Sequence, residues 1–247
     1  YDGNIYDLTV NPDGKISFTV SSNFTGNNSS YVVTEKIKSE EYYAVYNLLF
    51  TKENIPVYIA ASDTDKYFII KNKSKISEDY NNISYLKILP DDGLFYAASQ
   101  EPLGENLITN IYIFVNNKRY GPFNTYIYEG YDDPYQIITN ENGDYAFSIL
   151  EMENSGDIAK GSVITNKWTA RDIGFAANKQ YYNGDLYFNS WKNSSSDNQG
   201  YYTVYKNKTA ITGKYENLIN YKFDKGKKLI SFIGIRQNVV YYVTIKI

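Results

Sequence analysis

The stretch Leu8-Thr9-Val10-Asn11-Pro12-Asp13-Gly14-Lys15-Ile16 contains the pattern that decides the fold of this chain of 247 residues. Apolar side chains alternate with polar ones up to a Pro-Asp-Gly turn, and the alternation resumes after it. This period of two is typical of a half-buried β-strand, and glycine at the last turn position suits the positive φ of a short hairpin. The same turn recurs along the chain, and its copies end at Gly14, Asn54, Gly93, Gly143, Gly184 and Gly226.

Successive turns lie about 40 residues apart, apart from a longer interval between Gly93 and Gly143. Between them lies a second recurring element, a β run that ends in Asn-Lys or Glu-Lys, as in Val204-Tyr205-Lys206-Asn207-Lys208. One unit therefore contains four strands, and the chain contains six units. A repeat of this length with four strands indicates a propeller blade. The sequence predicts an all-β fold, a six-bladed β-propeller with four antiparallel strands per blade.

The two ends of the chain predict how the ring closes. The sixth unit ends after its third strand, at Val240 to Ile247, and Tyr1 to Ile5 aligns with the end of a fourth strand. We expect these N-terminal residues to complete the last blade, so that residues 1–247 form a single propeller domain. Because the chain starts at Tyr1 and its one methionine is Met152, we also expect it to be a piece of a longer protein.

The composition excludes several classes of function. The chain has no histidine and no cysteine, which excludes Ser-His-Asp triads, thiolate nucleophiles, disulfides and zinc knuckles. Its 25 basic and 28 acidic side chains give a net charge of −3, too balanced for a general nucleic-acid binder. No apolar run is long enough to span a bilayer as a helix. We therefore expect no enzyme, no catalytic residues, no metal site, no cofactor, no nucleic-acid partner and no transmembrane segment.

Two copies of the repeat carry a resemblance to a known family. They are the opening stretch, Leu8 to Ile16, and Tyr221-Lys222-Phe223-Asp224-Lys225-Gly226-Lys227-Lys228-Leu229. Both resemble the WD40-like repeats of TolB-type bacterial β-propellers, although the second and fifth copies depart from the motif. The resemblance implies a scaffold that binds other macromolecules. Because the chain does not start with methionine and is rich in surface-type Tyr, Asn, Ser and Thr, we expect a bacterial protein of the periplasm, cell surface or medium.

The expected site lies at the end of the blades that carries the long connections, because variable loops on a rigid scaffold usually perform recognition. The most distinctive connection, Thr125 to Tyr135, interleaves tyrosines with carboxylates. It could bind a basic peptide, a glycan or a cation, or its tyrosines could pack back onto the blade. Trp191 could stack a sugar or pack within its blade. The predicted binding residues are Tyr126, Tyr128, Glu129, Tyr131, Asp132, Asp133 and Trp191.

Two function hypotheses follow from these patterns. The first is a non-catalytic propeller that binds a protein or peptide partner through its long-loop face. The alternative is a glycan-binding, lectin-like propeller, or a glycoside-active one that uses carboxylates at the central channel. Carboxylates with raised pKa values at the channel would favour the enzyme.

Overall fold

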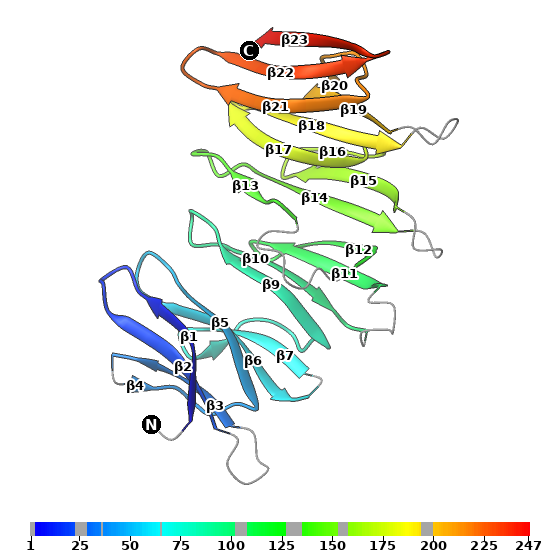
Figure 1. The fold of residues 1–247 in the computed structure, drawn as a ribbon. Coiled ribbons are helices and arrows are strands. Elements are labelled where there is room, and N and C mark those ends of the chain that lie inside the picture. The colour runs from blue at the N-terminus through cyan, green and yellow to red at the C-terminus, as the bar shows by residue number, and fades with distance from the viewer. Residues whose placement is uncertain are drawn as a thin grey trace. The chain divides into compact units, whose positions relative to one another are not determined.

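The computed structural model describes residues 3–22, 29–35, 37–64, 66–101, 108–126, 135–152, 158–193 and 200–247. These residues form β-strands joined by turns and loops (Figure 1). Within these ranges there is no helix of the length and hydropathy needed to cross a membrane. The predicted all-β class is confirmed. The chain divides into two compact units, residues 1–129 and 130–247, and each is described by itself.

The first unit contains three antiparallel sheets, and in each the four strands follow one another in chain order. The first sheet consists of β1 (Asn4–Val10), β2 (Ile16–Ser22), β3 (Ser29–Thr34) and β4 (Ile37–Lys38). The second sheet consists of β5 (Ala44–Phe50), β6 (Pro56–Asp63), β7 (Lys66–Lys71) and β8 (Ser74–Lys75). The third sheet consists of β9 (Asn82–Ile88), β10 (Leu94–Ser99), β11 (Ile108–Val115) and β12 (Lys118–Tyr126).

The second unit repeats this arrangement. The fourth sheet consists of β13 (Ile138–Thr139), β14 (Tyr145–Met152), β15 (Ile158–Thr165) and β16 (Thr169–Ala170). The fifth sheet consists of β17 (Phe175–Tyr182), β18 (Asp185–Asn193), β19 (Gly200–Lys206) and β20 (Thr209–Ala210). The sixth sheet consists of β21 (Asn217–Asp224), β22 (Leu229–Arg236) and β23 (Val239–Lys246). Six successive meanders of three or four strands match the predicted units, and each predicted turn joins the first two strands of its sheet.

Apolar side chains fill the space between neighbouring sheets within each unit. In the first unit, Ile83 and Leu86 of β9 pack against Val57 and Ile59 of β6. In the second unit, Ile230 and Phe232 of β22 pack with residues of the fifth sheet such as Tyr187 and Val204. Alternate residues of a strand face opposite sides of its sheet, so each meander can pack on a neighbour through each face.

A β-bulge interrupts the first strand in several of the sheets. The pairing register shifts beside Asp7 in β1, Asn47 in β5, Asn178 in β17 and Asn220 in β21. These four residues all have positive φ, between 46° and 57°. Asn and Asp tolerate this left-handed conformation better than other residues with a side chain. Bulges of this kind re-aim the side chains of the strand that carries them.

The expected role of the N-terminal residues is wrong for the part that the structure describes. Asn4 pairs with Ser21 and Ile5 with Val20, so both belong to the first hairpin and not to the last sheet. Gly3 continues this path, because a Cβ on Gly3 would lie 2.8 Å from the Ser21 carbonyl oxygen. Within the described residues the last sheet has three strands, and ring closure by strand pairing is not seen.

Within each unit taken by itself, apolar side chains are exposed on one outer sheet, the first sheet of the first unit and the last sheet of the second. Leu8 follows the bulge of β1 as Leu48 follows that of β5, yet Leu8 is 65% exposed and Leu48 only 4%. In the last sheet, Val240 and Tyr242 of β23 are 67% and 74% exposed. These residues occupy faces that in the interior sheets of each unit are covered by a neighbouring sheet.

Candidate functional site

The two recurring turns of a sheet lie at the same end of the strands and are joined by polar side chains. In the fourth sheet, Asn166 Nδ2 donates to Asp144 Oδ1 at 3.0 Å, and Lys167 Nζ lies 2.8 Å from Asp144 Oδ2. In the fifth sheet, Asn207 Nδ2 donates to Asp185 Oδ1 at 2.7 Å, where Lys206 also forms an ion pair. The Asn-Lys elements therefore tie one turn to the other.

The ion pairs lower the pKa values of both carboxyl groups. Burial alone would raise the pKa of Asp144, but hydrogen bonds from Lys167, Asn166 and Asn140 outweigh burial and lower it. The pKa of Asp185 is likewise lowered by Lys206 and Asn207 against the effect of burial. These carboxylates stay ionised and hold the turns together, as expected of structural groups and not of general acids.

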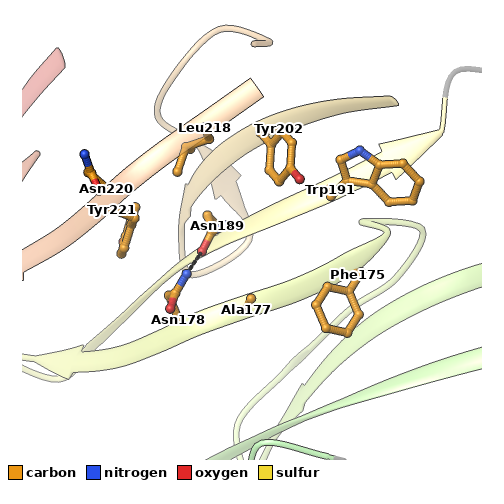
Figure 2. Close-up of a pocket in the computed structure, with 9 residues that line it drawn as sticks. All are labelled: Phe175, Ala177, Asn178, Asn189, Trp191, Tyr202, Leu218, Asn220 and Tyr221. Atoms are coloured by element: carbon orange, nitrogen blue, oxygen red, sulfur yellow. Dashed lines mark hydrogen bonds between the residues drawn. The ribbon is translucent and has the colours of Figure 1, made fainter. Parts of the chain in front are cut away.

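The opposite end of the fifth sheet borders a cavity of about 520 Å³ in the second unit. Its walls come from β17, β18 and β19 on one side and from β21 on the other (Figure 2). The two sheets pack closely nearer the turns, where the rings of Tyr187 and Phe223 lie 5.6 Å apart. The cavity begins where this packing ends, next to the residues that lead into the connection between β18 and β19.

Three aromatic residues form a row across the fifth sheet. Phe175 pairs with Trp191, and Trp191 pairs with Tyr202. Directly paired residues point to the same face of a sheet, so the three rings share one wall of the cavity (Figure 2). The row spans three strands, about 10 Å at ordinary strand spacing. Phe175 is 38% exposed, so part of this apolar wall faces solvent.

Three asparagine amides supply the polar part of the lining. Asn178 Nδ2 donates to Asn189 Oδ1 at 2.9 Å, a contact drawn in Figure 2. Asn220 lies opposite, on β21. Asn178 and Asn220 are the bulge residues of their strands, with φ of 52° and 57°. The repeated bulge therefore places an amide on each side of the same cavity.

Two further features shape the cavity. A Cβ on Gly200 would lie 2.3 Å from Trp191 Nε1, so glycine at this position leaves room for the indole. On the other wall, Tyr221 has a buried hydroxyl without a hydrogen-bond partner among the described residues. Burial also raises the pKa of Tyr221 well above its ordinary value. This phenol stays neutral, and its hydroxyl is enclosed by the protein and does not face the cavity.

The predicted site residues have different outcomes. Trp191 lines the cavity. Tyr126 is the last residue of β12, and its side chain is not described. The other predicted residues, Tyr128, Glu129, Tyr131, Asp132 and Asp133, lie outside the described residues. The predicted site as a whole therefore stays a prediction.

Most of the cavity lining was not predicted from the sequence. Phe175 and Tyr202 become neighbours of Trp191 only through the strand register, which a single sequence does not give. The 42-residue interval from Asn178 to Asn220 equals the repeat length and could have indicated equivalent positions.

Lys179, in β17 of the fifth sheet, is a buried lysine with a structural role. Lys179 is 3% exposed, and its Nζ donates to Ser148 Oγ at 2.7 Å and lies 3.3 Å from Gln136 Oε1. Ser148 Oγ in turn donates to the carbonyl oxygen of Ala176. The Ser148 hydroxyl thus accepts one hydrogen bond, from Lys179, and donates one, to Ala176, and both lie within the core.

No protein-family model and no curated protein matches this chain. Among solved structures, the chain is similar to the β-propeller domain of the Trilobed protease from Pyrococcus furiosus. The TM-score is 0.40 at 11% identity, over 98% of this chain and 78% of that one. It is also similar to a structure described as the eukaryotic initiation factor, with a TM-score of 0.43 at 7% identity, over 91% of this chain and 59% of that one. Both TM-scores lie below 0.5, and neither likeness bears on the function of this chain. The resemblance to TolB-type repeats stays a prediction.

Proposed function

We propose that this chain is a non-catalytic binding protein, and that it binds at the end of its sheets that carries the long connections. The observation that carries this proposal is the cavity of the second unit. Its described lining combines aromatic rings and amides, and no charged side chain is among these described residues. A cavity with convergent polar groups on an apolar wall is the usual form of a small-ligand site.

The chemistry of the cavity favours binding over catalysis. Amides and aromatic rings do not titrate near neutral pH, and Tyr221 is held in its neutral form. General acid–base catalysis needs a group that gains and loses a proton in the working range. The described carboxyl groups with shifted pKa values are Glu41, Asp144 and Asp185, and all three are shifted downward. This gives no support to the glycoside-active alternative.

We also propose that the six sheets form a propeller ring. The uncovered face of the first sheet, which includes Leu8, and that of the last, which includes Val240 and Tyr242, support this proposal. If these faces stay exposed, apolar surface remains in water, which costs about 25 cal/mol of free energy for each Å². In a closed ring each face covers the other, without the strand pairing predicted from the sequence.

The partner expected from the sequence is a protein or peptide that contacts the long connections of an exported bacterial protein. The test is capture of partners by the full chain and by a variant in which residues 127–134 are replaced with a Gly-Ser linker. Thr125 and Tyr135 are kept, because both are buried. Loss of a captured protein with the linker variant, but not with Lys52→Ala at the turn end, is expected. Capture that depends on the turn end alone would contradict the proposal.

A further inference from the structure

Resting on the proposed binding function, we infer that the cavity between the fifth and sixth sheets binds an uncharged saccharide. The inference comes from three features of the described lining: the row of rings, the amides and the absence of charge among the residues that the structure describes there. Each favours or disfavours a class of ligand.

The aromatic row favours a ligand with flat apolar faces that repeat along its length. Phe175, Trp191 and Tyr202 lie on one face of three adjacent strands. A pyranose ring presents C–H groups on its faces and hydroxyls on its edges, and it stacks on aromatic rings through the C–H face. A wall of about 10 Å is longer than a single planar base requires, and it suits successive sugar rings.

The amides fit the hydroxyl edges of such rings. Each Asn side chain offers a donor and an acceptor in one plane, and a sugar hydroxyl both donates and accepts. Among the described residues, Asn178 and Asn189 bond to each other through one donor and one acceptor, which leaves Asn178 Oδ1 and Asn189 Nδ2 for a ligand. A purely apolar ligand would desolvate these groups without replacing their hydrogen bonds, at about 1–3 kcal/mol for each group.

The described lining disfavours ligands whose recognition depends on charge. Among the residues that the structure describes, no Lys, Arg, Asp or Glu lines the cavity. A carboxylate or phosphate would lose its hydration here without gaining a counter-charge.

The test uses the fluorescence of Trp191 in the full chain. The chain has two tryptophans, so Trp168→Phe leaves Trp191 as the sole reporter. The probes are maltotriose, cellotriose, chitotriose and mannotriose, with trigalacturonate as a charged counterpart, and tetraproline and uridine as ligands of other classes. We expect saturable binding of at least one neutral trisaccharide and binding of trigalacturonate that is weaker by about tenfold or more.

Variants locate the binding. Trp191→Ala, followed by calorimetry, is expected to weaken the neutral trisaccharide by about tenfold or more. Phe175→Ala provides a second test at a half-exposed ring, should Trp191→Ala fail to fold. Asn189→Asp keeps the side-chain shape but adds a charge, and it should also weaken binding. Trp168→Ala, outside the cavity, is the matched control and should leave the affinity unchanged.

The outcomes separate this inference from the proposed function. If no neutral trisaccharide binds, if Trp191→Ala and Phe175→Ala leave the affinity unchanged, or if only tetraproline or uridine binds, the inference is wrong. Binding of those two ligands would leave the proposed binding function intact. If a trisaccharide binds in the cavity and its glycosidic bonds are hydrolysed, the inference holds and the non-catalytic function is wrong.

Discussion

At the scale of single residues, Asp144 has a structural role that its residue type alone does not indicate. Aspartates in an acidic chain would ordinarily be solvated surface groups. Asp144, however, has a side chain only 7% exposed and accepts hydrogen bonds from Lys167, Asn166 and Asn140. The turn that ends at Gly143 and the Asn166-Lys167 element could both be predicted as turns from the sequence. The contact between them could not, because it depends on two strands whose pairing brings the turns together.

Asp144→Asn should destabilise the protein at neutral pH by about 1–3 kcal/mol, because it replaces a buried charged acceptor that has three donors. The pKa of Asp144 is lowered in the folded state, so its stabilisation is present above the unfolded pKa and is lost as the pH falls through the folded one. Urea unfolding should therefore show a smaller difference between variant and wild type near pH 2. Asp79→Asn is the control, since Asp79 forms an exposed ion pair with Lys75. An equal effect of both variants would contradict the explanation.

Two glycines with similar backbone angles should differ in their tolerance of alanine. Gly14 has φ of 79° and nothing within 4 Å of an added Cβ, so Gly14→Ala should cost about 1–2 kcal/mol from the conformation alone. Gly174 has φ of 75°, and its Cβ would lie 2.1 Å from the Trp191 carbonyl oxygen. Gly174→Ala should cost clearly more. Thermal unfolding of the two variants measures the difference, and equal melting temperatures would contradict it.

At the scale of elements, the fourth strands of three sheets are interrupted, and the repeat in the sequence does not show where. β4, β8 and β20 each have two residues, and the pairing resumes at an isolated bridge made by Tyr42, Tyr80 or Tyr215. In each gap a hydroxyl, from Ser39, Ser77 or Thr212, accepts a backbone N–H that the strand would have paired.

The pattern Ser/Thr-x-x-Tyr thus marks the interruption in three sheets, and it is present in the sequence. The alternation of apolar and polar residues does not indicate the interruption. The hydroxyl takes the place of a backbone acceptor and does not change the spacing of the apolar residues. The tyrosines could be counted from the composition, but their positions between sheets could not be deduced from it.

The bridging tyrosines join one sheet to the next. Tyr80 follows β8, is 4% exposed, and packs its ring 5.7 Å from that of Phe114 in the third sheet. Tyr80→Ala should destabilise the protein by about 3–5 kcal/mol through the cavity that it leaves, whereas Tyr80→Phe should cost much less. Urea unfolding followed by circular dichroism checks both variants. A large loss with Tyr80→Phe would instead indicate that the hydroxyl matters more than the ring.

At the scale of the molecule, the sequence predicts the number and order of the sheets, because each turn residue repeats with its strand. It does not predict where the N-terminal strand pairs, since Ile5 has the same alternation whether it pairs with Val20 or with the last sheet. The register shown by the structure, with Ile5 opposite Val20, decides between the two pairings. The cavity depends equally on register and on packing between sheets, and of its lining only Trp191 was predicted.

The proposed ring can be tested at Leu8. If the first and last sheets cover each other, Leu8→Ser should cost about 2–4 kcal/mol, similar to Leu86→Ser within the first unit, where Leu86 is 7% exposed. If the faces stay in water, Leu8→Ser should change the free energy of unfolding by less than about 0.5 kcal/mol. Denaturant unfolding of both variants in the same buffer distinguishes the two cases.

One consequence follows from the glycines behind the aromatic row. Gly161 and Gly174 bring backbone against backbone. A Cβ on Gly161 would lie 1.7 Å from the Gly174 carbonyl oxygen, and a Cβ on Gly174 would lie 2.1 Å from the Trp191 carbonyl oxygen. The strand that carries the indole thus rests on main chain with no rotamers to rearrange. A saccharide that binds to this wall would therefore restrict the protein little, and the loss of conformational entropy on binding should be small. The time course of saccharide association should follow a single exponential, with no slow isomerisation phase.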